Sequence, residues 1–130
     1  MGAKENAEAI RGGYEAFNAA DLERLTPLFD ESVRWHVPGR SSLAGDYDGR
    51  DATFGYFGRL GQETGGKFQA ELRDVVASGD HVVGLHDSRG QRGAKTLDVG
   101  VALVFRMQGG KIVEAWEHYG DMYAWDDFWQ

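Results

Sequence analysis

Apolar side chains recur every three or four positions in the first sixty residues and at every second position after them. The apolar positions of the first pattern are Ala7, Ile10, Tyr14 and Phe17. They share one face of a helix, which the pattern predicts to end near Asn18. Asp21 is predicted to cap a short second helix that Pro27 interrupts, and a third helix is predicted over residues 51–60.

A period of two residues, typical of β-strands, begins at Lys67. It predicts a strand starting there and further strands over 81–89, 96–107 and 111–119, preceded in the chain by a β-rich run over 32–37. Tight hairpins are expected at 78–80 and 108–110. Residues 40–49 are interpreted as a loop, and the Gly-rich basic stretch 89–95 as a solvated hairpin turn.

Early helices followed by an antiparallel meander predict an α+β fold. We expect a strongly curved antiparallel sheet packed on three N-terminal helices, with a conical cavity between the layers. Residues 1–130 are interpreted as a single domain, because the length suits one core and one ligand cavity and no linker or repeat is visible.

Composition narrows the possible functions. A formal net charge of −7 argues against nucleic-acid and anionic-membrane partners, and no apolar run is long enough to span a bilayer. With no cysteine and an acidic N-terminal segment unlike a signal peptide, a cytoplasmic location is expected. There is no nucleotide-binding glycine motif, and four dispersed histidines lack metal-ligand spacing, so neither cofactor nor metal is expected.

The last predicted strand carries the strongest functional signal. Alternation places Trp116 and His118 on one face, together with Glu114, and Asp121 follows directly after the strand. An aromatic wall beside a titratable ring suggests a small-molecule pocket. Alternatives remain open: His118 as a structural histidine, Glu114 as an exposed charge, and Asp121 as the N-cap of a helix over 122–129.

Four segments carry a family resemblance. They are Tyr14-Glu-Ala-Phe-Asn-Ala-Ala-Asp-Leu-Glu, Val33-Arg-Trp-His-Val-Pro-Gly, Ala44-Gly-Asp-Tyr-Asp-Gly-Arg-Asp-Ala and Gly110-Lys-Ile-Val-Glu-Ala-Trp-Glu-His-Tyr-Gly-Asp. With the order of elements, they resemble the SnoaL-like branch of the nuclear transport factor 2-like superfamily, which includes polyketide cyclases and relatives of ketosteroid isomerases. The resemblance implies a cystatin-like α+β barrel and leaves the reaction open, because this scaffold hosts several chemistries and non-catalytic binders.

Residue matching within the superfamily favours the cyclases. The catalytic aspartate of ketosteroid isomerases corresponds to Val37 and their oxyanion-hole aspartate to Leu103, while their helical tyrosine falls one residue before Tyr14. These apolar matches argue against the isomerase mechanism. The Asp-Arg-Asp set of limonene-type epoxide hydrolases corresponds to Ser88, His86 and His118, which makes epoxide hydrolysis a weaker alternative.

SnoaL-type cyclases pair a His with a carboxylate shortly after the final-strand Trp. Asp121 matches that carboxylate, and His86 and His118 are both candidates for the histidine. His86 also has a plain interpretation, as a solvent-facing residue beside Arg89.

These observations lead to one main hypothesis and two alternatives. The main hypothesis is a cofactor-independent enzyme that uses general acid/base chemistry on a small hydrophobic, carbonyl-bearing or polycyclic metabolite, as a cyclase, isomerase or dehydratase. The candidate catalytic residues are His118, Asp121 and His86, and the candidate substrate-binding residues are Trp35, Trp116, Tyr14, Tyr56, Val37 and Leu103. The alternatives are a non-catalytic binder with the same cavity and a protein-interaction module. A homodimer is expected from the resemblance and from the aromatic tail.

Overall fold

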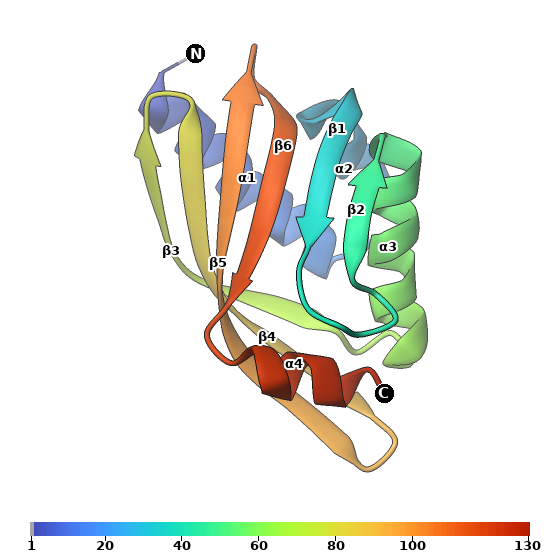
Figure 1. The fold of residues 1–130 in the computed structure, drawn as a ribbon. Coiled ribbons are helices and arrows are strands. Elements are labelled where there is room, and N and C mark those ends of the chain that lie inside the picture. Colours follow the sequence, from blue (N-terminus) through green and yellow to red (C-terminus); the bar gives the residue numbers. More distant parts are fainter. Residues whose placement is uncertain (1) are drawn as a thin grey trace.

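The computed structural model describes residues 2–130, with four α-helices and a six-stranded sheet (Figure 1). The elements in order are α1 (Ala3–Asn18), α2 (Leu22–Leu25), the 3-10 helix η1 (Thr26–Leu28), β1 (Phe29–Val37), β2 (Gly45–Asp48), α3 (Arg50–Glu63), β3 (Gln69–Ser78), β4 (His81–Arg92), β5 (Lys95–Gln108), β6 (Lys111–Tyr119) and α4 (Met122–Phe128). Asp21 caps α2 by accepting a hydrogen bond from the Arg24 backbone N–H at 3.2 Å, as the sequence predicts.

The sheet has the strand order β2-β1-β6-β5-β4-β3. All neighbours pair antiparallel except β1 and β6, which are parallel, so the meander of β3 to β6 is confirmed and the fully antiparallel sheet is not. Strand β2 lies within the segment interpreted as a loop. Its short run, Gly-Asp-Tyr-Asp, carries little apolar signal, and it forms by pairing with the edge of β1.

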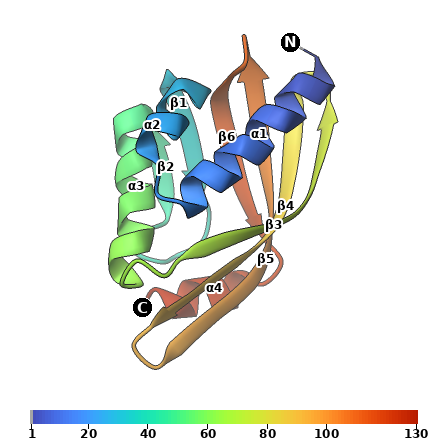
Figure 2. The same cartoon turned by 180° about the vertical axis from the view of Figure 1, so that it is seen from behind.

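Helices α1 and α3 lie on the same face of the curved sheet (Figure 2), and this face is called the inner face below. The buried core lies between the two layers, with residues from α1, α3 and the inner sides of the strands. The predicted α+β class, with a curved sheet packed on helices, is confirmed. No helix of residues 2–130 is long and apolar enough to cross a membrane.

A β-bulge in β6 decides which side chains face inward. The pairing with β5 runs from Met107–Ile112 to Arg106–Glu114, so Val113 is the extra residue. Before the bulge Ile112 is buried, and after it Ala115 and Glu117 are the buried positions. Because side chains alternate with period two, one extra residue moves the whole second half of the strand to the opposite face.

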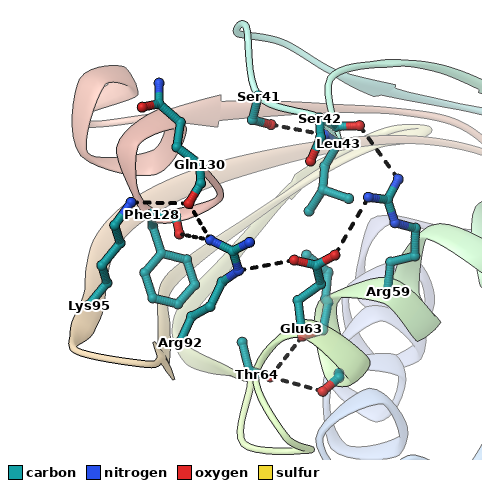
Figure 3. Close-up of polar contacts among 12 residues, drawn as sticks. Ser41, Ser42, Leu43, Arg59, Glu63, Thr64, Arg92, Lys95, Phe128 and Gln130 are labelled. Carbon is teal, nitrogen blue, oxygen red and sulfur yellow. Dashed lines mark hydrogen bonds and ion pairs between the residues drawn. The ribbon is translucent and has the colours of Figure 1, made fainter.

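Helix α4 closes one end of the molecule against the hairpin that joins β4 and β5 (Figure 1). Lys95 Nζ donates to the Asp127 carbonyl at 2.7 Å. Arg92 donates to the Phe128 carbonyl at 3.2 Å and to Glu63 of α3 at 3.0 Å (Figure 3). These cations lie where the carbonyls at a helix C-terminus need donors. The stretch 89–95 thus contains the predicted hairpin, with an exposed turn at 93–94, but Arg92 and Lys95 bind the end of α4.

Candidate active site

A cavity lies between α1, α3, α4 and the inner face of the sheet. The cavity volume, measured as the space that the centre of a water molecule can occupy, is about 70 Å³. This is several times the volume that one water molecule needs on the same measure. Among the described residues its aromatic lining is Tyr14, Phe17, Phe29, Trp35, Tyr56, Phe57, Phe68, Phe105 and Trp125. No lysine or arginine of residues 2–130 lines it, and the polar side chains in its wall include Glu117, His86 and Ser88.

Glu117, on the inner side of β6, is a buried carboxyl group held by three neutral donors. Trp35 Nε1 donates to Oε2 at 2.7 Å, and the Tyr56 hydroxyl lies 2.9 Å from Oε2 and 3.1 Å from Oε1. The Tyr119 hydroxyl donates to Oε1. No ion pair of Glu117 is found among the described residues.

The surroundings of Glu117 favour its neutral form. Burial raises the pKa of Glu117, because a charged carboxylate loses its hydration inside the protein, and the hydrogen bonds from Tyr119, Trp35 and Tyr56 offset this only in part. Burial and the nearby Glu117 charge also raise the pKa of Tyr56 and of Tyr119, so both hydroxyls stay protonated donors.

A second polar chain crosses the wall from α1 to β4. The Tyr14 hydroxyl and His86 Nδ1 are 2.6 Å apart, and His86 Nε2 lies 3.1 Å from Ser88 Oγ. Gly84 makes this geometry possible, because a Cβ atom at that position would lie 2.4 Å from the Tyr14 oxygen. Burial lowers the pKa of His86 to about 4, although the Asp87 charge acts in the opposite direction. His86 is therefore neutral at physiological pH.

The structure brings five of the nine candidate residues into the cavity wall: Tyr14, Trp35, Tyr56, His86 and Leu103. Alternation along β4 directs His86 inward with Ser88, away from the solvent-facing position beside Arg89. Trp35 faces inward with the buried side of β1.

Four candidates lie elsewhere. Trp116 and His118 do share a face, as predicted, but the bulge at Val113 turns that face outward, so the expectation that they face the pocket is wrong. Asp121 accepts a hydrogen bond from the Ala124 N–H at 3.0 Å and caps α4, which is the plain alternative. Val37 is buried but is not part of the cavity wall.

Trp116 instead packs on His36 on the outer face of the sheet, with ring centroids 5.7 Å apart. His36 lies 2.7 Å from both Asp46 and Glu114. Partial burial disfavours the charged imidazole, but the hydrogen bonds and charges of Asp46 and Glu114 outweigh it and raise the pKa of His36. Within residues 2–130 no group of three or more His, Asp or Glu side chains has the geometry of a metal site.

Glu117 is the functional candidate that sequence analysis missed. Regular alternation from the apolar Ile112 places Glu117 with the solvent-facing side chains, so period two alone predicts that Glu117 is exposed. The signal that was available is the run Ile112-Val113, two apolar residues in succession where strict alternation allows one.

The fold, a curved sheet covered by helices, is shared with known proteins. The SnoaL-like domain model matches residues 10–115 of the chain. The chain belongs to the SnoaL-like family. Among curated relatives, an uncharacterised protein of Mycobacterium tuberculosis is 32% identical over 123 residues, which cover 94% of each chain.

Two solved structures are also similar to the chain. Bal32a, from a soil-derived mobile gene cassette, is 51% identical, with a TM-score of 0.97 over 98% of each chain. IdmH, a proposed polyketide cyclase of Streptomyces antibioticus, is 25% identical, with a TM-score of 0.75 over 88% of this chain and 91% of its own. Polyketide cyclase activity is therefore a proposed function of one protein with this fold.

Proposed function

We propose that the cavity is the active site of a cofactor-independent enzyme that transfers protons on a small, uncharged, carbonyl-bearing molecule. Glu117 is the proton carrier. The observation that supports this most is the position of Glu117: a buried carboxyl group in an aromatic wall, without a cation partner among the described residues and with a raised pKa. A carboxyl group with a raised pKa is a better acceptor for a proton than an exposed one.

The chemistry follows from this placement. The Glu117 carboxylate takes a proton from the carbon next to a carbonyl, and the C–H electron pair becomes the C=C bond of an enol or enolate. Negative charge that develops on the oxygen needs a hydrogen-bond donor. Of the Tyr14 and Ser88 hydroxyls in the wall, the one that accepts from the His86 N–H keeps its own O–H free to donate. Return of the proton at another carbon gives isomerisation, and attack by the enolate on a second carbonyl gives ring closure. Loss of a β-hydroxyl as water gives dehydration.

The wall also selects the ligand by charge. Since no lysine or arginine of the described residues lines the cavity, a carboxylate or phosphate ligand would lie beside Glu117 without compensation. The aromatic lining and the small volume favour a flat, mostly apolar molecule.

The test does not require the natural substrate. Acetophenone and cyclohexanone are incubated in D₂O with the protein, and loss of the α-proton signal is followed by NMR. We expect exchange above the buffer rate, and a loss of at least about 100-fold in Glu117→Gln, in line with general acid/base contributions. Glu114→Gln is the matched control, because Glu114 lies on the outer side of the same strand, and it should retain exchange.

A binding protein is the second candidate, and one observation favours it. Both oxygens of Glu117 already accept hydrogen bonds from Trp35, Tyr56 and Tyr119, a geometry that also suits a structural carboxyl group. Ligand binding without any exchange above the buffer rate, or equal exchange by the wild type and Glu117→Gln, would contradict the enzyme and support the binder.

We also propose that two copies of the chain pair through the outer face of the sheet. An apolar strip crosses that face, made of Val76, Val83, Leu85, Val104 and Trp116. Val76 is 51% exposed and Leu85 is 38% exposed, and both lie in this strip beside three further apolar side chains.

A further inference from the structure

The cavity wall comes closest to solvent where α1, η1 and α3 meet. Most of the lining residues are buried, but four are only half-buried, and all four lie at this junction: Gly13, Phe17, Leu28 and Phe57. The rings of Phe17 in α1 and Phe57 in α3 are in edge-to-face contact, with centroids 5.2 Å apart. A ligand that enters the cavity at this junction must therefore part the two rings.

Helix α3 is weakly stabilised by its own sequence. Its interior contains Gly55, Gly58 and Gly61, and a Cβ atom at each would meet nothing within 4 Å beyond the backbone of the helix itself. Packing does not require glycine at these positions, yet each glycine makes the helix less stable than alanine would. The N-cap residue is Gly49, which has no side chain to cap the first turn. The helix therefore depends on its contacts with the rest of the protein.

Both ends of α3 are tied to other elements. The Gly49 N–H donates to the Val33 carbonyl of β1 at 2.7 Å. Arg92 donates to Glu63 in the last turn at 3.0 Å (Figure 3). The three interior glycines lie between these ties, so a loss of helical structure in α3 would be local and would leave the ends in place.

We propose that α3 is the lid of the cavity: it unfolds locally, parts Phe57 from Phe17, and so admits an uncharged aromatic ligand. This inference rests on the proposed use of the cavity as a ligand site. Tyr56, the neighbour of Phe57 in the chain, donates to Glu117 at 2.9 Å. Opening of α3 therefore also removes one of the three donors from the carboxyl group, and the ligand meets the complete site only when the helix has formed again.

The test measures the rates of ligand entry and release. In the triple variant Gly55→Ala, Gly58→Ala, Gly61→Ala, each alanine should lower the population of unfolded α3 about two- to fivefold, and the three together at least about tenfold. Exchange of 4-fluoroacetophenone between free and bound states is followed by ¹⁹F NMR. We expect the association and dissociation rate constants both to fall at least about tenfold. The Kd should stay within about twofold, because alanine stabilises α3 equally in the free and the bound protein.

Gly12→Ala is the matched control. Gly12 lies in the interior of α1, and a Cβ atom there also has open space. The substitution should stabilise its helix in the same way and leave both rate constants within about twofold of wild type. Wild-type rate constants in the triple variant, or slowing in Gly12→Ala comparable to that in the triple variant, would overturn the inference.

A second measurement needs no ligand. In native-state hydrogen exchange, the amides of α3 should exchange through a local opening at a higher rate than those of α1, and the triple variant should slow this exchange at least about tenfold. Equal protection of α1 and α3 in the wild type would contradict the lid.

The inference and the proposed function can fail separately. Slower ligand entry and release in the triple variant, without α-proton exchange that depends on Glu117, would support the lid and contradict the enzyme. Exchange that depends on Glu117, with wild-type rates of ligand entry in the triple variant, would support the enzyme and contradict the lid. Failure of 4-fluoroacetophenone to bind the wild-type protein would contradict the inference.

Discussion

Two titratable side chains in one cavity wall are shifted in opposite directions by the same cause. Burial raises the pKa of Glu117 and lowers the pKa of His86 to about 4, and both shifts favour the uncharged form. Burial therefore acts against charge on both side chains, and ionisation of Glu117 adds a negative charge to the wall. His86, neutral and bonded to Tyr14 and Ser88, acts in this arrangement by positioning hydroxyl groups rather than by carrying charge.

The lowered pKa of His86 predicts a loss of stability in acid. The unfolded chain binds a proton at the ordinary histidine pKa of 6.5, whereas the folded protein binds it only near 4. Stability from His86 is thus complete above pH 6.5 and is lost as the pH falls toward 4, by up to about 3 kcal/mol. The raised pKa of Glu117 acts with the opposite sign, since its cost to the fold appears as the pH rises through that pKa.

The measurement that isolates His86 is urea unfolding of wild type and His86→Asn between pH 4 and 7. The difference in unfolding free energy between the two proteins should shrink as the pH falls. His118→Asn makes the same substitution at an exposed position of β6 and should keep the wild-type profile. A His86→Asn profile parallel to that of the wild type would show that His86 is not buried as a neutral group.

At the scale of elements, close packing of α1 on β4 depends on Gly84. A Cβ atom there would lie 2.4 Å from the Tyr14 oxygen and under 3 Å from two carbons of its ring, so Tyr14 must move. We expect Gly84→Ala to lower the unfolding free energy by about 1–3 kcal/mol, as overpacking does, and to disturb the Tyr14–His86 contact. Gly100→Ala in the neighbouring strand meets its nearest atom at 3.8 Å and should be nearly neutral. Equal urea midpoints for the two variants would contradict this packing.

Comparison of the predicted with the observed elements shows which of their features the sequence pattern predicts. Local signals are reliable where the chain is regular: α1 ends at Asn18, Asp21 caps α2, and β6 spans residues 111–119 as predicted. The face of β6 could not be read from period two, because the bulge at Val113 forms by pairing with β5 and its residues carry no turn or glycine signal. Because the extra residue Val113 was not foreseen, the pattern predicted that His118 faces inward, whereas in the structure Glu117 does.

At the scale of the whole molecule, the fold class was predictable and the assembly of the site was not. Alternating and helical periods, with the four family-like segments, were enough for a curved sheet under helices. The cavity wall, however, is made by side chains from α1 to α4, η1 and five strands, and contacts such as Tyr14 to His86 or Trp35 to Glu117 join residues 72 and 82 positions apart. The cytoplasmic location stays a prediction.

The proposed pairing through the outer face gives the prediction at this scale. A dimer should have twice the 14.4 kDa mass of the chain, measured by light scattering after gel filtration. Leu85→Glu places a charge in the apolar strip and should give monomers, because a buried, unpaired carboxylate at an interface opposes association. Leu22→Glu makes the same change in α2, at a side chain that is 54% exposed, and should leave the dimer intact. A wild-type mass of one chain at micromolar concentration, or a Leu85→Glu protein that remains dimeric, would show that this strip is not the interface.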